Sequence, residues 1–227
     1  MTEEKVRAAE LILGAYGTAG QFQQRPAPEG GGIIKRDWFP IMDPPAPNTA
    51  EYTYWRNCRA TRGWDTGATE DGGDYTAGVL IRDLGKGRIP RFIVEDVRRG
   101  QWGPAQVERY MIGTTFADGK TVSVREEQEP GSAGKTVCAQ RSRELIGYDY
   151  KAVPVTGHKL VRLNGFRAAA EAGLFAILRG AWNEPYLAEL EVIPAGDHDD
   201  QGDGSSCAFN DLTSGPRPAK AVKLTWG

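Results

Sequence analysis

The run YTAGVLI at residues 75–81 decides the fold that we expect for this chain. It is almost continuously apolar, which is typical of a central strand that is covered on both faces. Residues 52–65 precede it as an irregular strand region, and a turn at residues 85–87 leads into a further apolar segment at residues 92–94. Consecutive strands joined by short turns predict an antiparallel meander at the start of the sheet.

The residues after this meander change from strand to helical periodicity. Pro104 stands where the first residue of a helix is often proline, and Val107 and Met111 then fall on one helical face. Strands are expected at 122–127, 150–155 and 174–178, and helices at 132–146, 163–173 and 185–191. This order predicts an α/β fold with a mixed sheet of five or more strands, antiparallel first and parallel afterwards, flanked by helices.

The two ends of the chain differ from this central part. Residues 2–13 predict a short helix, and residues 21–48 contain so many prolines and glycines that we expect an extended linker, anchored by Trp38, Phe39 and Ile41. The last residues show little periodicity. We therefore expect a helix and linker at 1–48, the α/β domain at 49–212 and a flexible tail at 213–227.

Composition excludes several classes of protein. The 227 residues include 28 Lys or Arg and 30 Asp or Glu, so the formal net charge of −2 gives no overall indication of nucleic-acid binding. No apolar run is long enough to cross a membrane, and no secretion leader is recognisable. The three cysteines lack metal-ligand spacing, which favours reduced thiols in a cytoplasmic protein.

The most unusual local composition is GDHDDQGDG at residues 196–204. It holds four aspartates, and no Lys or Arg occurs between Ile193 and Leu212. Adjacent carboxylates repel one another, so they form a solvated acidic loop or recruit a cation. A hard cation such as Mg²⁺ or Mn²⁺ fits better than zinc, because His198 is the single histidine there. His198 itself is a candidate for proton transfer or for a structural role.

Two further acidic positions are expected at the same edge of the sheet. Asp65 ends the first strand of the meander, and Glu126 and Glu127 end the strand after the first helix. Ligand sites in open α/β sheets form at the carboxyl ends of neighbouring strands. Three carboxylate groups meeting there would suit a site in which two metal ions act on one phosphate.

Basic residues could bind an anion beside these carboxylates. The segment GSAGKT at residues 131–136 resembles the end of a phosphate-binding loop, but residue 129 is Glu where that loop needs Gly, so we expect only a tight turn that places Lys135 near an anion. Arg62, Lys159 and Arg162 are either solvated or contact phosphates on both sides of a cut site.

Together these segments resemble a known family, the C-terminal nuclease domain of the large terminase subunit of tailed bacteriophages, which has an RNase H-like fold. The resemblance is carried, in the family's order, by GQFQQRPAPEGGGIIKRDWF, RGWDTGA, GDYTAGV, EEQEPGSAGK, TGHKLVR, AWNEPYLAELEVIP and HDDQGD. It implies Asp65 as the first metal ligand, Glu127 as the second with Glu126 as the alternative, and Asp199 and Asp200 as the third group. Asp74 and Asp203 fit supporting positions.

The resemblance also implies a function. It implies an endonuclease that uses two Mg²⁺ or Mn²⁺ ions to cut concatemeric double-stranded DNA in the host cytoplasm, with Lys159, Arg162, Lys135 and Arg62 binding the DNA. The family's ATPase domain would precede this segment, so we expect no ATPase activity here and expect that domain, the small terminase subunit and the portal protein as partners. A non-catalytic module that docks on DNA or the portal, and a resolvase or RNase H of the same fold, remain alternatives.

Overall fold

The computed structural model describes residues 32–67 and 73–215. The helix expected at residues 2–13, the first part of the linker and residues 216–227 of the tail lie outside the described residues. The strands are β1 (Ile41–Met42), β2 (Arg59–Asp65), β3 (Thr76–Asp83), β4 (Phe92–Gly100), β5 (Val122–Gln128), β6 (Asp149–Pro154) and β7 (Phe175–Leu178). The helices are η1 (Arg36–Trp38), α2 (Ala50–Asn57), α3 (Pro104–Asp118), α4 (Ser132–Glu144), α5 (Lys159–Glu171), α6 (Asn183–Val192) and α7 (Asp200–Thr213).

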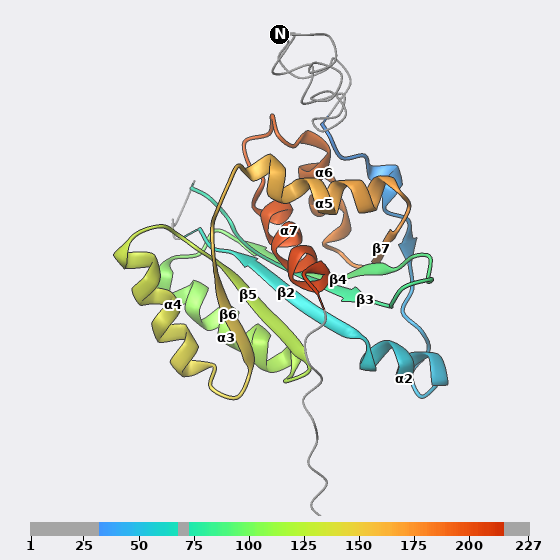
Figure 1. Ribbon diagram of the computed structural model, residues 1–227, viewed down its shortest axis with the longest axis horizontal. Coiled ribbons are helices and arrows are strands. Elements are labelled where there is room, and N and C mark those ends of the chain that lie inside the picture. Colours follow the sequence, from blue (N-terminus) through green and yellow to red (C-terminus); the bar gives the residue numbers. More distant parts are fainter. Residues whose placement is uncertain (1–31, 68–72, 216–227) are drawn as a thin grey trace, which may run out of the picture.

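The strands form one seven-stranded sheet in the order β1-β7-β4-β3-β2-β5-β6 (Figure 1). The consecutive strands β2, β3 and β4 pair antiparallel, whereas β5 joins β2, β6 joins β5 and β7 joins β4 in parallel. The α/β fold predicted from the sequence, with an antiparallel meander followed by parallel strands, is therefore confirmed.

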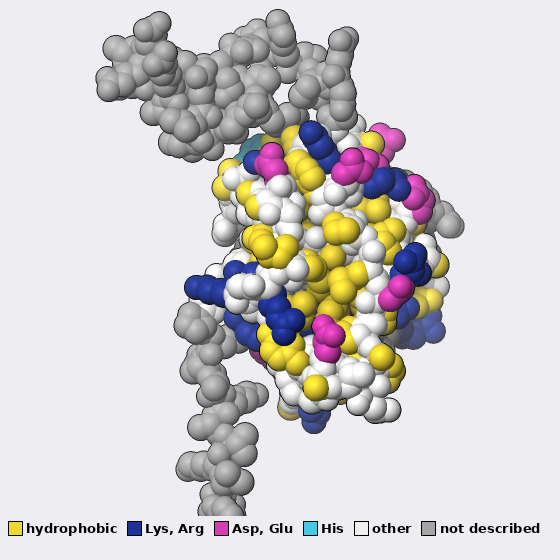
Figure 2. Space-filling model, turned by 90° about the vertical axis from the view of Figure 1, so that its right-hand side faces the viewer, with side chains coloured by type: hydrophobic (Ala, Val, Ile, Leu, Met, Phe, Trp, Pro, Cys, Tyr) yellow, Lys and Arg dark blue, Asp and Glu magenta, His cyan; other side chains and the backbone are white. Residues whose placement is uncertain are grey.

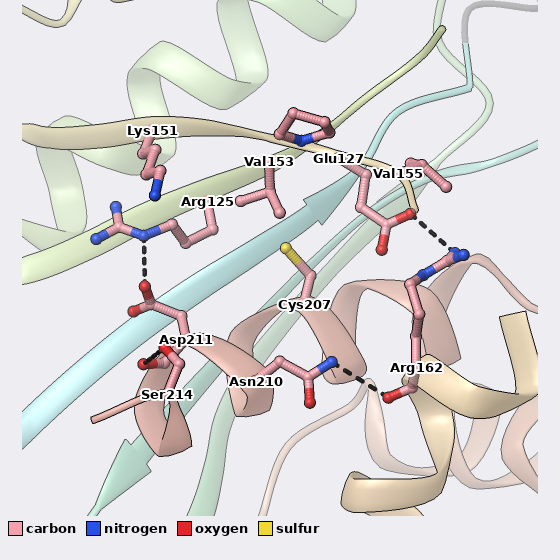
Figure 3. Close-up of a pocket in the computed structure, with 11 residues that line it drawn as sticks. Arg125, Glu127, Lys151, Val153, Val155, Arg162, Cys207, Asn210, Asp211 and Ser214 are labelled. Carbon is pink, nitrogen blue, oxygen red and sulfur yellow. Dashed lines mark hydrogen bonds and ion pairs between the residues drawn. The ribbon is translucent and has the colours of Figure 1, made fainter. Parts of the chain in front are cut away.

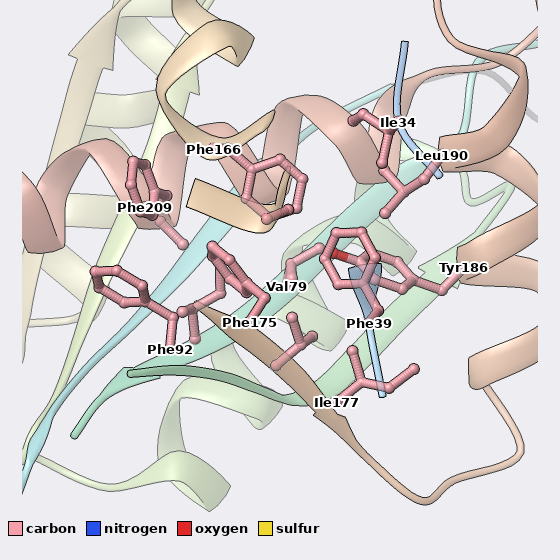
Figure 4. Packing of buried hydrophobic residues seen from close by; sticks show 14 of the residues in the cluster. Ile34, Phe39, Val79, Phe92, Phe166, Phe175, Ile177, Tyr186, Leu190 and Phe209 are labelled. Carbon is pink, nitrogen blue, oxygen red and sulfur yellow. The ribbon is translucent and has the colours of Figure 1, made fainter. Parts of the chain in front are cut away.

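Helices cover both faces of this sheet. On one face, α5, α6 and α7 pack over β3, β4 and β7 around a core rich in aromatic rings, which includes Phe92, Phe166, Phe175 and Phe209 (Figure 4). On the other face, α3 packs its Val107 and Met111 against Trp64 and Val124. Neighbouring residues of β3 face opposite sides of the sheet, since Val79 belongs to the aromatic core and Leu80 packs with Ala60 and Val122. This double coverage explains the continuous apolar run.

The segment just before the expected domain boundary packs on the sheet. Ile34 and Phe39 are buried in the aromatic core, and the Phe39 ring lies 5.8 Å from the rings of both Phe166 and Phe175. The edge strand β1 pairs in parallel with β7, and Ile41 of β1 is exposed. Among the expected anchors, Phe39 is thus fully buried and Trp38 is partly buried against the same core.

The strand region expected at residues 52–65 begins as a helix. Thr49 caps α2, because its hydroxyl accepts a hydrogen bond from the Tyr52 amide at 3.1 Å. The buried Trp55 then anchors α2 against Ile93 and Ala176. On the side of the molecule where α2, β1 and β7 lie, hydrophobic side chains gather in the middle and charged ones surround them (Figure 2).

The acidic segment, expected as a loop, continues into the helix α7. This helix crosses the middle of the sheet and contacts β2 and β3 despite the two glycines in its first turns (Figure 1). A Cβ atom on Gly63 of β2 would lie 2.2 Å from the Gly204 carbonyl oxygen, so the backbones of strand and helix touch directly. No helix in residues 32–67 and 73–215 has both the length and the apolar character of a membrane span.

Candidate active site

The first two carboxylates of the site stand at the ends of neighbouring parallel strands. Asp65 is the last residue of β2, and Glu127 lies one residue before the end of β5. Trp64 is the register partner of Glu126, so the next residue on each strand, Asp65 and Glu127, lies on the opposite face. Because Trp64 packs under α3, Asp65 and Glu127 face α7.

The structure does not bring Glu126 to this site. Its carboxylate is buried on the α3 and α4 face, where it pairs with the Arg141 guanidinium and accepts a hydrogen bond from the Tyr150 hydroxyl at 2.6 Å. Of the two glutamates left open by the sequence, Glu127 is the one that lies with Asp65. Glu126 instead ties β5 to α4 and β6.

The third acidic group comes from the first turn of α7. Asp200 and Asp203 are buried there, and Asp199, which precedes the helix, is about one third exposed. The buried Glu189 of α6 holds this turn in place, because it accepts hydrogen bonds of 2.6 Å from both the main-chain amide and the side-chain amide of Gln201. Sequence reasoning missed this positioning by Glu189.

The carboxylates are close enough to perturb one another. Burial, reinforced by the charges of Asp203, Glu127 and Asp200, raises the pKa of Asp65 well above its usual range. Burial and the charge of Asp203 raise the pKa of Glu127 to about 7, although Arg162 and Lys159 oppose this shift. Burial also raises the pKa values of Asp200 and Asp203. Carboxyl groups with pKa values raised in this way are typical of functional sites.

A divalent cation fits this donor set. Within the described part of the chain, Asp200 Oδ2 and Asp203 Oδ1 are buried and have no hydrogen-bond partner. Buried carboxylate oxygens normally have a partner, and hard cations such as Mg²⁺ and Mn²⁺ take oxygen ligands. Among these same residues, however, no three acidic, His or Cys side chains already stand in a metal-binding arrangement. A positive group of the chain itself lies between two of them, since Lys159 Nζ is 2.5 Å from both Asp199 Oδ1 and Asp203 Oδ2.

The four basic candidates have different surroundings. Lys159 and Arg162, both on α5, contact the carboxylates, and Lys135 is exposed in the first turn of α4. Arg62 is 1% exposed and pairs with Asp96 and Asp118. A guanidinium buried in such pairs cannot reach DNA, so the structure contradicts the assignment of Arg62 to DNA binding.

A pocket opens beside Glu127, between β5, β6 and α7 (Figure 3). Its volume is about 240 Å³, and Arg125, Lys151 and Arg162 contribute its basic groups. Arg162 Nη2 lies 3.3 Å from Glu127 Oε2, and Cys207 of α7 forms part of the wall beside them. The pocket therefore lies next to Glu127 of the carboxylate cluster and is lined in part by basic side chains.

His198 and Asp74 lie near Asp200 at the start of α7. The His198 ring packs edge-on against Tyr75 at 4.8 Å, and its Nδ1 is 3.9 Å from Asp200 Oδ2. Asp74 is near enough for its charge to contribute to the raised pKa of Asp200. The two residues thus act in opposite directions on Asp200, since the charge of Asp74 raises the pKa of its carboxyl and His198 lowers it.

A helical signal in the acidic segment could have revealed α7. Asp200, Asp203, Cys207 and Asp211 recur at intervals of three or four residues, as on one face of a helix. The glycines between them obscured this pattern. No sequence signal would have revealed the contacts of Lys159, because they depend on how α5 packs against α7.

Comparison with known proteins agrees with this geometry. The sequence pattern of the terminase RNaseH-like domain matches residues 62–212, which is more than half of the chain. The chain belongs to this family. This terminase domain has the fold of the large terminase nuclease from thermophilic phage G20c. The magnesium-bound form of that phage nuclease superposes on this chain with a TM-score of 0.58 and is 15% identical in sequence. The match covers 81% of this chain and 98% of the phage nuclease chain.

A second structure of the same phage protein gives a similar result. The zinc-bound form has a TM-score of 0.57 and 15% identity, and the match covers 77% of this chain and 95% of that one. At this identity the likeness concerns the fold of the terminase domain. A search of curated proteins finds no significant match.

Proposed function

We propose that this terminase domain is a divalent-metal-dependent endonuclease that hydrolyses phosphodiester bonds of double-stranded DNA. The observation that carries the proposal is the meeting of Asp65, Glu127, Asp200 and Asp203 at the ends of β2, β5 and the start of α7, with buried oxygens that have no hydrogen-bond partner among the described residues. Similarity to one phage terminase nuclease, whose structures contain bound magnesium or bound zinc, supports it.

The carboxylates supply the metal-binding part of this mechanism. Asp65, Glu127, Asp200 and Asp203, with Asp199 at the rim, would hold one or two Mg²⁺ or Mn²⁺ ions. Bound ions of this kind polarise the phosphate, activate the attacking water and stabilise the leaving oxygen. The buried Glu189 keeps the first turn of α7 in register with the strand ends, so that Asp200 and Asp203 remain opposite Asp65.

The basic groups would position the DNA strand. The Arg162 guanidinium lies at the boundary between Glu127 and the pocket, where it can donate to a phosphate oxygen next to the cut. Lys151 lines the same pocket and Lys135 is exposed on α4, so both can contact the backbone without reading the sequence. This arrangement fits a strand that runs from the carboxylates into the pocket.

Family membership extends this proposal to the biological setting. We expect concatemeric phage DNA in the host cytoplasm as the substrate. We further expect the terminase ATPase domain, the small terminase subunit and the portal protein as partners.

Plasmid cleavage tests the proposal. Wild-type protein should convert supercoiled plasmid to open and linear forms with Mn²⁺ or Mg²⁺ and should be inactive in EDTA. Asp65→Asn should reduce the rate on the order of 10³-fold or more, because it removes a central carboxylate from the site. Asp197→Asn is the matched control, since Asp197 is exposed in the same acidic segment, and it should stay within about twofold of wild type.

Other results would point elsewhere. DNA binding without cleavage, across metals and protein concentrations, would support the docking module instead. Preferential cutting of branched DNA or of RNA–DNA hybrids would support a resolvase or RNase H. Undiminished cleavage by the Asp65→Asn protein would exclude the site that we describe.

A further inference from the structure

Two cations from α5 already contact the carboxylate cluster. Lys159 is the first residue of α5, and its Nζ lies 2.5 Å from Asp199 Oδ1 and 2.5 Å from Asp203 Oδ2. One turn later, Arg162 Nη2 lies 3.3 Å from Glu127 Oε2 and 3.8 Å from Asp203 Oδ1. Each of the two carboxylate oxygens of the buried Asp203 is thus paired with one of these cations.

These contacts partly compensate the negative charge of the carboxylates. Burial and neighbouring carboxylates raise the pKa values of Asp65, Glu127 and Asp203, whereas Lys159 lowers all three. The ammonium therefore performs part of the charge compensation that a divalent cation would perform. Because the ammonium contacts oxygens of Asp199 and Asp203 directly, its positive charge repels a divalent cation that binds at those oxygens.

The ammonium can leave without moving the helix. The buried Leu163, Phe166 and Ala170 fix α5 in the aromatic core, and the side-chain amide of Asn210 donates to the Arg162 carbonyl oxygen at 3.2 Å. The Lys159 side chain is 34% exposed, and the residues before it, 154–158, are exposed as well. A lysine side chain has a long flexible stem, so it can turn towards solvent.

We propose that Lys159 is an internal counter-ion that stabilises the metal-free site and is displaced from Asp199 and Asp203 when a divalent cation binds. This inference rests on the proposed function of the same site. Lys159 therefore sets the affinity of the site for metal, and its first role is not to hold DNA. An exchange of this kind would keep the carboxylates together before the metal arrives and would weaken metal binding in return.

Metal titration of a substituted protein gives the first test. Mn²⁺ binding is measured by isothermal titration calorimetry on wild-type protein, Lys159→Met and Lys120→Met. Lys159→Met should bind at least about tenfold more tightly, because no ammonium has to be displaced. Lys120→Met makes the same change on an exposed lysine just before β5, at the opposite end of that strand from Glu127, and should bind like wild type.

Chemical labelling of the wild-type protein gives the second test and needs no variant to fold. Lysines are acetylated with a limiting amount of reagent, with and without Mn²⁺, and the extent at each lysine is measured by mass spectrometry. Labelling of Lys159 should rise severalfold when Mn²⁺ binds, whereas labelling of Lys120 should not change. This readout also separates displacement from a merely long-range effect of the lysine's charge on affinity.

The outcomes separate this inference from the proposed function. Equal Mn²⁺ affinity of wild type and Lys159→Met, or Mn²⁺ binding without a rise in Lys159 labelling, would overturn the counter-ion role while metal-dependent plasmid cleavage could still stand. Absence of Mn²⁺ binding in both proteins would also overturn it, and together with intact plasmid it would remove the proposed function as well.

Discussion

Glu126 and Glu127 are neighbours in sequence but have opposite electrostatic surroundings. The Glu126 carboxylate is buried against a guanidinium and a hydroxyl, which stabilise its charge. The Glu127 carboxylate lies among other carboxylates, which disfavour its charge. Strand alternation places one on each face of the sheet, so one residue stabilises the fold and the other serves the proposed site.

Substituting these two residues should therefore have opposite effects on stability. Glu126→Gln should lower the free energy of unfolding by about 3 kcal/mol, because it leaves the buried Arg141 charge poorly compensated. Glu127→Gln should leave stability in EDTA equal to or above that of wild type and should weaken Mn²⁺ binding. Urea unfolding in EDTA and calorimetric Mn²⁺ titration measure both effects. A larger loss of stability from Glu127→Gln than from Glu126→Gln would contradict the assignment.

The raised pKa of Glu127 also predicts how stability depends on pH without metal. A glutamate in the unfolded chain releases its proton near its usual pKa of 4.5, whereas folded Glu127 retains it up to about pH 7. The folded state thus binds more protons over this range, so Glu127 makes stability fall as pH rises from about 4.5 to 7, by at most about 3 kcal/mol. In EDTA, Glu127→Gln should show a shallower fall of Tm between pH 5 and 7. An identical pH profile of the two proteins would refute this expectation.

At the scale of elements, α7 depends on close packing more than on its own sequence. Gly202 and Gly204 lower the intrinsic helix propensity of its first turns. The helix forms over the sheet because Gly63 lets its backbone approach β2, where a Cβ atom would lie 2.6 Å from the Ala208 amide nitrogen. The same contact places Asp200 and Asp203 opposite Asp65, so packing and site geometry are coupled.

Adding one methyl group at this contact should therefore affect both stability and activity. Gly63→Ala should lower the free energy of unfolding by about 1–3 kcal/mol through overpacking, and it should reduce cleavage because α7 moves away from Asp65. Gly113→Ala in α3 is the control, since its added Cβ meets nothing within 4 Å and should raise stability by about 0.5–1 kcal/mol. Thermal unfolding measures the stability of both variants, and plasmid cleavage measures their activity. Wild-type stability and activity in the Gly63→Ala protein would contradict the coupling between packing and site geometry.

The elements that sequence could predict are those with strong local signals. The apolar run at 75–81, the proline at the start of α3 and the turn glycines gave the order of strands and helices from β3 to α6. The short strand β1 and the helix α2 could not be predicted, since they depend on tertiary contacts such as Trp55 against Ile93, and the glycines of α7 obscured its helical spacing.

The residues of the candidate site also divide into those that the sequence could indicate and those that required the structure. The acidic segment could be selected from the sequence because its composition is unusual, and Asp65 because the carboxyl ends of neighbouring strands form ligand sites in open α/β sheets. The choice of Glu127 over Glu126 needed the face of β5 that α7 covers, and the burial of Arg62 needed the positions of Asp96 and Asp118. Both depend on distances between residues far apart in the chain.

For the whole molecule, the net charge of −2 says little about the surface that would meet DNA. Several arginines are almost fully buried and pair with carboxylates of neighbouring elements, namely Arg62, Arg82, Arg125 and Arg141. These pairs cancel inside the fold. What remains unbalanced is the carboxylate cluster, which Lys159 and Arg162 offset in part, with Lys151 beside the pocket.

This imbalance makes metal binding a stabilising event for the entire domain. A ligand at about 100 times its Kd adds about 2.7 kcal/mol to the free energy of unfolding, which for a domain of this size raises Tm by about 5–10 °C. Mn²⁺ should produce such a shift in wild-type protein, whereas KCl at matched ionic strength should not. Asp65→Asn should begin with a higher Tm in EDTA, because it removes one charge from the crowded cluster, and should gain less from Mn²⁺. Scanning fluorimetry measures both proteins, and an equal Mn²⁺ shift in the two would place the metal away from the ends of β2 and β5.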